Sequence, residues 1–380
     1  MNREIESDIR RTLLTRGVVV GADSVRAAAQ SNGAVVDEQN VAAIASQLSA
    51  DLRGYGPLEP FLSDSQVTDI VVNGAAEVWV DRGDGMTLTG TQFRDDFSVR
   101  RMAQRLAASC GRRLDEASPF VDAPLAQGVR LHAMLPPLVD RISVAIRVPR
   151  HRAWSLDDLT ASGFVPPDAR QFLLDVVRGR HSFLISGGTG SGKTTLLNAL
   201  LGELRPSERA VIVEDTRELA PRHRHVVSLQ TRAPNIEGAG AVTMQDLVRQ
   251  TLRMRPDRIV VGEVRGAEVI DLLTALNTGH RGGCCTVHAN SASDILPRLE
   301  ALAALGAMPR SSLQRLVAAA LELVVHLDRD QAGRRRVAAL AMVRDHGESV
   351  SVTPAFRCDP DGHVLPEAAA DEWRQTVGVP

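Results

Sequence analysis

The chain has 380 residues and a nearly balanced charge, with 44 basic and 46 acidic residues and a formal net charge of −2. Single hydrophobic cores stop growing at roughly 250 to 300 residues, so we expect two domains. The balanced charge and the 3% aromatic content argue against direct nucleic-acid binding. No apolar run approaches the roughly 18 residues of a membrane span, and the first residues lack the apolar core of a signal peptide. We therefore expect a cytoplasmic protein with at most peripheral membrane contact.

The four cysteines and the single lysine each limit the kinds of site that the chain can form. Cys110, Cys284, Cys285 and Cys358 form no CxxC pair, which predicts small buried apolar side chains and neither a zinc site nor a redox motif. Lys193 is the only lysine, so arginine supplies every other basic side chain. A compact ammonium can reach between phosphate groups where a planar guanidinium fits badly, which gives a local reason for this single lysine.

The N-terminal part of the chain divides into an extension and a small domain. Residues 1–52 alternate short apolar stretches with charges, as in Val41–Leu48, and indicate peripheral helices. Residues 53–148 indicate a smaller α+β domain, with strand patterns in VTDIVV, EVWVD, MTLTG, GVRLHAML and RISVAIRV and a helix from Ser98 to about Ser109. The charged, non-periodic residues 149–158 are expected to form a linker.

The second domain is expected at residues 159–345. Short β-rich runs (HSFLIS, AVIVE, VVSLQ, RIVVG and GCCTVH) alternate with helical patterns such as TTLLNALLGEL and AEVIDLLTALNTG. Such alternation predicts an α/β fold with a largely parallel sheet covered by helices. Pro297 is tolerable only in the first turn of a helix, so the helix around SASDILPRLEAL is expected to start late. Residues 346–380 indicate C-terminal strands and turns followed by a polar tail.

A glycine-rich segment carries the most specific chemical signal. It matches the pattern G-x-x-x-x-G-K-[ST] directly after the strand HSFLIS and before a helix, which is the context that a phosphate-binding loop requires. Glycines let backbone N–H groups face phosphate oxygens, and Thr194 offers a hydroxyl to Mg²⁺. We therefore expect ATP and Mg²⁺ as cofactors, with a nucleotide site made by Gly187, Gly188, Thr189, Gly190, Ser191, Gly192, Lys193, Thr194 and Thr195.

Three further strand ends carry polar side chains. RIVVG ends in Glu263, AVIVE brings Glu214 and Asp215, and GCCTVH brings His288. Parallel strands deliver their carboxyl ends to one edge of a sheet, where α/β proteins bind ligands. We expect Lys193, Glu214, Glu263 and His288 to meet at one nucleotide, with Glu263 orienting or activating the attacking water.

The ordered segments ISGGTGSGKTTLLNAL, VIVEDTREL, RPDRIVVGEVRGAE and NTGHRGGCCTVHANS resemble the Walker A, Asp, Walker B and His boxes of the secretion and pilus ATPase superfamily (type II/IV secretion ATPases). Upstream, GYGPLEPFLSDSQVTDIVVNG, GRRLDEASPFVDAPL and LHAMLPPL resemble the N-terminal domain of the CpaF-type Tad/Flp pilus assembly ATPases. The resemblance covers about residues 53 to 345.

This resemblance implies a RecA-like P-loop NTPase motor preceded by a PAS-like N-terminal domain, with ATP between the two. It implies a homohexamer on the cytoplasmic face of the inner membrane, which acts on a membrane platform protein and only indirectly on pilins. By position, Lys193 and Thr194 match the phosphate and magnesium residues and Glu263 the catalytic glutamate. Glu214 and Asp215 match the Asp box, with Asp215 a second magnesium residue, and His288 matches the phosphate-sensing histidine.

The resemblance also implies that arginines of the N-terminal domain, from the same or a neighbouring subunit, complete the site by neutralising charge in the transition state. Such arginines are worth about 10³ to 10⁵ in rate in other NTPases. The sequence departs from the family pattern here, with Pro124 where relatives carry arginine and His132 where they carry asparagine. The candidates in this segment are Arg113, Arg130, Arg141 and Arg147.

Alternative functions stay open on the sequence alone. Type II secretion ATPases carry a four-cysteine zinc module, which the absence of CxxC disfavours. Type IV secretion ATPases for DNA or protein transfer and pilus retraction ATPases share the four boxes. A RecA-like ATPase that translocates nucleic acid would need a basic channel, and a nucleotide-binding scaffold without hydrolysis would not need Glu263.

Overall fold

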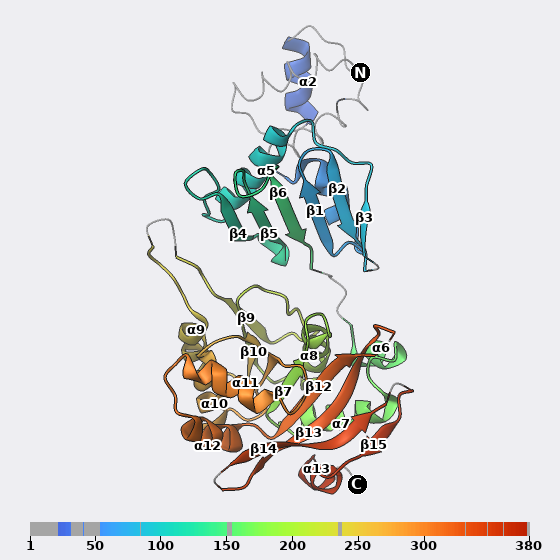
Figure 1. Cartoon of the computed structure of the whole chain (residues 1–380), viewed down its shortest axis with the longest axis vertical. Coiled ribbons are helices and arrows are strands. Elements are labelled where there is room, and N and C mark those ends of the chain that lie inside the picture. Colours follow the sequence, from blue (N-terminus) through green and yellow to red (C-terminus); the bar gives the residue numbers. More distant parts are fainter. Residues whose placement is uncertain are drawn as a thin grey trace. The chain divides into compact units, whose positions relative to one another are not determined.

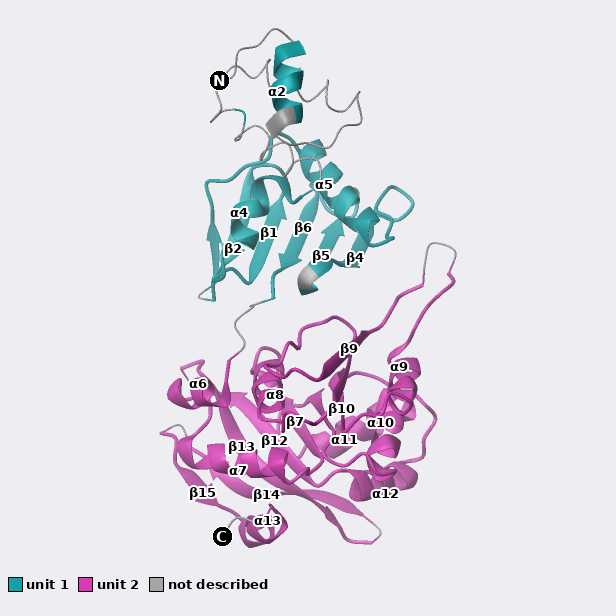
Figure 2. Cartoon of the chain, turned by 180° about the vertical axis from the view of Figure 1, so that it is seen from behind, with its two compact units in different colours: residues 1–151 teal, residues 152–380 magenta. Residues whose placement is uncertain are grey.

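The computed structural model describes residues 22–31, 41, 54–83, 85–149, 154–234, 238–330, 332–347, 349–359 and 361–377. The chain forms two compact units, Met1–His151 and Arg152–Pro380 (Figure 2). Of the expected N-terminal extension, the described part is helix α2 (Ala22–Ser31) together with Val41. The helix expected over Val41–Leu48 otherwise lies outside the described residues.

The first unit is built on a six-stranded antiparallel sheet in the order β3-β2-β1-β6-β5-β4. All of its strands except the exposed edge strand β3 alternate buried and more exposed side chains, so that one face of the sheet belongs to the core and the other does not. The strands are β1 (Asp69–Asn73), β2 (Glu77–Asp81), β3 (Met86–Leu88), β4 (Phe120–Pro124), β5 (Arg130–Met134) and β6 (Ser143–Arg147).

Helix α5 (Asp96–Ser109) covers the buried face of this sheet. It begins at Asp95, whose side chain accepts a hydrogen bond from the backbone N–H of Ser98 at 2.7 Å. Its apolar residues recur at helical spacing, at Val99, Met102 and Leu106. The unit also contains the short helices η1 (Gly56–Leu58), α4 (Glu59–Leu62) and η2 (Ala126–Gly128). Strand β4 is the one strand of this unit that the sequence pattern did not predict.

The second unit holds a nine-stranded sheet in the order β15-β14-β13-β12-β7-β11-β10-β8-β9. Strands β12, β7, β11, β10, β8 and β9 run parallel, and β13 to β15 continue the sheet antiparallel beyond β12. The predicted α/β fold is therefore confirmed. The strands are β7 (Phe183–Gly187), β8 (Ala210–Glu214), β9 (Val226–Gln230), β10 (Arg258–Val264), β11 (Cys284–His288), β12 (Leu323–Arg329), β13 (Arg335–Asp345), β14 (Val350–Cys358) and β15 (Val364–Pro366).

Helices cover both faces of this sheet (Figure 1) and bury a separate apolar core on each. One core is covered by α6 (Leu156–Ala161), α7 (Pro167–Arg178), α8 (Lys193–Gly202) and α13 (Ala370–Val377). The other is covered by α9 (Met244–Thr251), α10 (Glu268–Asn277), α11 (Ile295–Ala304) and α12 (Arg310–Ala320). Strands β7, β8 and β10 are buried on both faces of the sheet, which explains why their sequences are mostly apolar and do not alternate with polar residues.

Two segments differ from what the sequence pattern indicated. The last residues of the expected linker form the first turn of α6, because Ser155 and Asp158 make a capping box at its start. The expected polar tail is a helix of the second unit, α13, whose Trp373 is fully buried against Phe356 of β14. Both segments are polar on average, so the sequence pattern did not indicate that a few of their apolar residues are buried.

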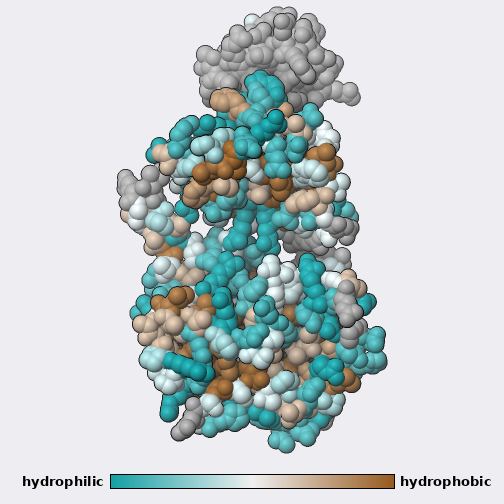
Figure 3. Space-filling model, in the orientation of Figure 1, coloured by the Kyte–Doolittle hydropathy of each residue, from teal (hydrophilic) through white to brown (hydrophobic). Residues whose placement is uncertain are grey.

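No helix among the described residues is long and apolar enough to cross a membrane. On the face drawn in Figure 3, hydrophilic residues predominate, and hydrophobic residues form small separate groups within each unit. The predicted burial of the cysteines is correct for Cys284, Cys285 and Cys358, whereas Cys110 is only partly buried.

Candidate functional site

The glycine-rich loop connects the end of buried strand β7 with the start of α8. Three of its glycines have positive φ angles, at Gly187 (154°), Gly190 (68°) and Gly192 (100°), a region that other residues rarely adopt. Space requires glycine as well, because a Cβ at Gly187 would lie 2.6 Å from the carbonyl oxygen of Leu327. At Gly192 it would lie 2.7 Å from the ring of Phe164. The loop is therefore held in one compact conformation.

Lys193 lies inside this loop and is only 9% exposed. Its ammonium donates hydrogen bonds to the carbonyl oxygens of Gly187 at 2.9 Å and Gly188 at 3.0 Å. Burial lowers the pKa of Lys193, and the negative charge of Glu263 partly offsets that effect. The loop thus curls around a positive charge at the N-terminus of a helix, which is an arrangement suited to phosphate.

The ends of four neighbouring strands bring the predicted polar residues to this loop. His288, the last residue of β11, is the Cα partner of Gly187 in the parallel pair β11–β7. Strand β10 follows next in the sheet and carries Glu263, and β8 follows β10 and ends at Glu214. The Glu214 side chain lies so close to Gly262 that a Cβ there would meet its Cγ at 2.6 Å. Lys193, Glu214, Glu263 and His288 are thus brought together at one edge of the sheet.

Glu214 is a buried carboxyl group with one unused oxygen. Its Oε1 accepts hydrogen bonds from the backbone N–H groups of Glu218 and Leu219, each at 3.0 Å. Its Oε2 has no hydrogen-bond partner among the described residues, although the side chain is only 4% exposed. Burial raises the pKa of Glu214 to about 7, against the opposing effect of the two N–H donors. A buried, unpaired oxygen at a strand end marks a place where a ligand, ion or water is expected.

Glu263 is paired with an arginine that the sequence argument did not single out. Arg265 Nε donates to Glu263 Oε2 at 3.0 Å, and its Nη2 lies 2.5 Å from the same oxygen. The Arg265 guanidinium is also close enough to Asp215 and Glu218 for their charges to act on it. Arg265 follows directly after the last residue of β10, only two residues from Glu263, so the pair was close enough in the sequence to have been noticed.

Oxygen groups suited to Mg²⁺ gather beside the loop. Thr194 Oγ1 donates to Glu218 Oε2 at 3.4 Å, and Asp215 Oδ1 accepts from Thr231 Oγ1 at 3.3 Å. Hydroxyl and carboxylate oxygens are the ligands that Mg²⁺ takes beside bound phosphates. Together with the unpaired Glu214 oxygen, this donor set fits a magnesium nucleotide. Glu218 was missed from the sequence, although it lies only four residues after Glu214.

The four arginine candidates lie in the first unit. Arg113 is paired with Asp115, and Arg141 packs against Gly74. Arg130 of β5 and Arg147 of β6 are direct cross-strand partners, so their side chains share a face of the sheet.

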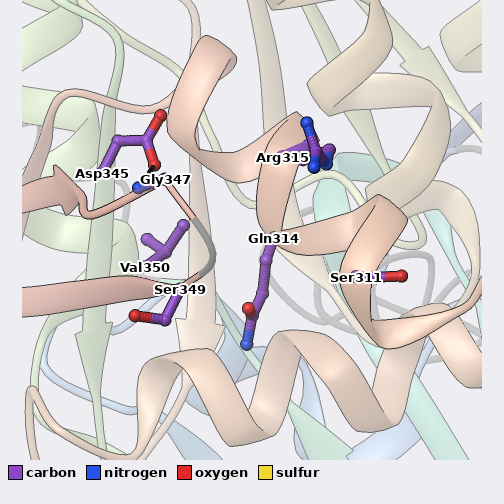
Figure 4. Close-up of a pocket in the computed structure, with 7 residues that line it drawn as sticks. All are labelled: Ser311, Gln314, Arg315, Asp345, Gly347, Ser349 and Val350. Atoms are coloured by element: carbon purple, nitrogen blue, oxygen red, sulfur yellow. Dashed lines mark hydrogen bonds between the residues drawn. The ribbon is translucent and has the colours of Figure 1, made fainter.

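The structure also contains a small pocket at a different place in the second unit (Figure 4). It lies between α12 and the β13–β14 hairpin and is lined by Ser311, Gln314, Arg315, Asp345, Gly347, Ser349 and Val350. Strand β13 runs antiparallel to β12, so Asp345, near the end of β13, lies beside the start of β12. The glycine-rich loop begins at Gly187, which pairs with Leu327 near the other end of β12. The pocket is therefore at the opposite edge of the sheet from the predicted site.

Comparison with known proteins places most of the chain in one family. A family model described as "Type II/IV secretion system protein" matches residues 51–358. A "Putative conjugal transfer protein" from Mycobacterium tuberculosis is 50% identical over 319 residues, covering 82% of this chain and 91% of that protein. The "Type IV secretion system protein PtlH" from Bordetella pertussis is 34% identical over 328 residues, covering 78% and 96%. The crystal structure of "the Pilus Retraction Motor PilT" shares the fold, with a TM-score of 0.53, 18% identity and coverage of 85% and 88%.

Proposed function

This chain belongs to the type II/IV secretion system protein family and is an ATPase of that family, and we propose that it hydrolyses ATP at the loop Gly187–Thr194. The observation that carries this proposal is the buried Lys193 ammonium, enclosed by a glycine-rich loop at a helix N-terminus. Bound ATP supplies the phosphoanhydride bond, and Mg²⁺ supplies positive charge beside it.

In the proposed mechanism the residues of this chain bind the phosphates and Mg²⁺ and orient the attacking water. The loop N–H groups and Lys193 hold the phosphates, and Thr194 and Asp215 hold Mg²⁺. The Glu263 carboxylate, freed from its pair with Arg265, accepts a hydrogen bond from the attacking water and orients it. His288 lies beside Gly187 and senses the phosphates. The roles of Arg113, Arg130, Arg141 and Arg147 stay predictions; Arg130 and Arg147 are direct cross-strand partners.

For the biological role, we propose a homohexameric motor on the cytoplasmic face of the inner membrane that powers assembly of a Tad/Flp-type pilus or a related secretion system. Its support is the sequence resemblance to CpaF-type ATPases over about residues 53 to 345. A second candidate is a type IV secretion ATPase for transfer of DNA or protein, favoured by the names of the conjugal transfer and PtlH relatives. Both roles imply a membrane platform protein as the direct partner.

The catalytic part of the proposal is tested by two substitutions in the full chain. Lys193→Ala should abolish binding of an ATP analogue, because the loop loses its only buried cation. Glu263→Gln should keep nucleotide binding but lower kcat by about 10² to 10⁴, the range for loss of a positioned general base. If Lys193→Ala binds the analogue normally, the site is wrong. If Glu263→Gln hydrolyses ATP at the wild-type rate, the carboxylate has another role.

The two biological roles are separated by purification from native membranes. A pilus motor should bring a polytopic platform protein and small pilins, whereas a conjugal transfer motor should bring the proteins of a DNA-transfer channel. The mass of the purified particle tests the hexamer, which should contain six subunits of 40.9 kDa. Hydrolysis stimulated by single-stranded DNA would contradict the expectation that the motor makes no direct nucleic-acid contact.

A further inference from the structure

Strand β12 forms one wall of the glycine-rich loop, although it lies outside the four sequence segments that identified the site. It pairs in parallel with β7, with His326 opposite Ser186 and Leu327 opposite Gly187. The backbone oxygen of Leu327 leaves no room for a side chain at Gly187. Two side chains of β12, His326 and Arg329, reach the loop or the strand that enters it.

His326 is buried between the strand that enters the loop and the segment that follows His288. Its Nδ1 lies 2.9 Å from the Oγ of Ser186, and the two residues are 7% and 0% exposed. Burial lowers the pKa of His326, against the opposing effects of the Asp328 charge and the backbone of Asn290. The lowered pKa favours the neutral ring, which shares one hydrogen bond with the Ser186 hydroxyl at Nδ1.

Arg329, at the end of β12, contacts the loop itself. Its Nη2 donates to the carbonyl oxygen of Gly190 at 2.9 Å, and its Nη1 donates to the carbonyl of Gly333 at 3.1 Å. A loop that turns its N–H groups inward toward phosphate turns carbonyl groups outward, and those carbonyls need donors. Arg329 supplies such a donor at Gly190, where φ is positive.

We propose that His326 and Arg329 are positioning residues that hold the glycine-rich loop in its phosphate-binding conformation before nucleotide arrives. This inference rests on the proposed nucleotide site at Gly187–Thr194. Glycine-rich segments lose more conformational freedom on ordering than any other segments, and a ligand that must order its own site binds more weakly. The loss of either side chain should therefore weaken nucleotide affinity and raise KM, with a smaller effect on kcat.

The His326 contact is tested by a pair of substitutions. His326→Gln keeps one donor and one acceptor, whereas His326→Leu fills similar space and leaves the Ser186 hydroxyl buried without a partner. The Leu variant should bind a non-hydrolysable ATP analogue roughly tenfold more weakly, equivalent to about 1.4 kcal/mol, and the Gln variant should restore affinity to within about threefold of wild type. Ser186→Ala removes the same hydrogen bond while keeping the ring, so it tests the inference if the Leu variant fails to fold.

The Arg329 contact has a matched control in the same hairpin. Arg334 is also exposed, but its guanidinium pairs with Asp330 at 2.7 Å. Arg329→Met should raise the Kd of the analogue about threefold to tenfold, whereas Arg334→Met, with the same change in charge, should leave it unchanged. Equal effects of the two would mean that Arg329 acts only through its charge, which overturns the positioning role.

Lys193→Ala separates failure of this inference from failure of the proposed site. If Lys193→Ala loses the analogue while His326→Leu, Ser186→Ala and Arg329→Met bind it like wild type, the positioning role is wrong and the nucleotide site stands. If Lys193→Ala binds normally, the site itself is wrong and this inference falls with it. A rise in KM that the Gln variant reverses, at unchanged melting temperature, supports the positioning role.

Discussion

Single side chains at the edge of the second sheet are held in states that differ from their states in water. Lys193 is buried against backbone carbonyls, Glu263 is paired with Arg265, and Glu214 keeps an oxygen without a partner. The burial of Lys193 and of the unpaired Glu214 oxygen costs stability that an exposed or fully paired group would keep. We interpret these three residues as groups whose remaining contacts are completed by nucleotide, Mg²⁺ and water.

The buried Glu214 predicts a stability that depends on pH. Its pKa is about 7 in the folded chain and 4.5 in the unfolded chain, so between these values the folded state holds the extra proton. Stability from this group is complete below pH 4.5 and is lost as the pH rises through about 7. Glu214→Gln cannot lose a proton, so its stability relative to wild type should increase by about 1 to 3 kcal/mol from pH 5 to pH 8.

Chemical denaturation at both pH values measures this change. Glu367→Gln is the control, since Glu367 is an exposed carboxyl group of the same unit. A difference between Glu214→Gln and wild type that is the same at pH 5 and pH 8 would show that Glu214 is already ionised in the folded state at pH 5.

At the scale of secondary structure, the site depends on how four parallel strands are held together at their N-terminal ends, opposite the glycine-rich loop. Arg258 begins β10 and is 1% exposed. Its guanidinium donates to Glu208 at 3.1 Å, to the carbonyl of Gly282 at 3.0 Å and to the carbonyl of Val177 at 2.6 Å. One side chain therefore joins the end of α7 to the segments that precede β8 and β11. These contacts fix the spacing of the strands, and therefore also the spacing of the loops at their C-terminal ends.

Removal of the Arg258 guanidinium should destabilise the second unit strongly. Arg258→Met keeps the apolar stem but leaves Glu208 buried, and Arg180 at 3.7 Å is then its one charge partner among the residues that the structure describes. We expect a loss of about 3 kcal/mol in the free energy of unfolding, because a buried charge is left poorly compensated. Arg253→Met is the control at an exposed arginine five residues earlier and should change stability by less than about 0.5 kcal/mol. Equal effects of the two would contradict the role of Arg258 in holding the strands together.

At the scale of the whole molecule, the two units have separate hydrophobic cores. The core of the first unit shares no residue with either core of the second. Units with their own cores can unfold as separate cooperative transitions. The loop and the carboxylates of the proposed site lie in the second unit and the candidate arginines lie in the first, and the contact of these arginines with nucleotide stays a prediction.

Calorimetry tests whether the two units unfold separately and whether both contact the nucleotide. We expect two thermal transitions, of which Arg258→Met lowers only the one that belongs to the second unit. Saturating non-hydrolysable ATP analogue should raise both midpoints, because a ligand stabilises every folded unit that it contacts. If the midpoint of the first unit does not rise, its arginines do not contact the nucleotide in the assembly present. Where the midpoint of the first unit does rise, Arg130→Gln combined with Arg147→Gln should abolish that rise and leave the rise of the second unit unchanged.

The sequence alone determined the features that depend on local pattern. The Gly187–Thr194 loop follows from a fixed spacing, and β8 and β9 occupy the predicted segments because apolar runs of that length have few alternatives. Helix α11 begins two residues before Pro297, as the restriction on proline required. The α/β fold of the second unit follows from the alternation of these elements.

Tertiary structure alone decided the features that depend on neighbours distant in sequence. Strand β12 was not among the predicted strands, and only its pairing with β7 shows that His326 and Arg329 reach a loop about 140 residues earlier in the chain. The unpaired oxygen of Glu214 and the buried Trp373 likewise exist only because other elements cover them. Spacing along the chain defines the loop, but the groups that hold and surround it are set by packing, which local sequence does not encode.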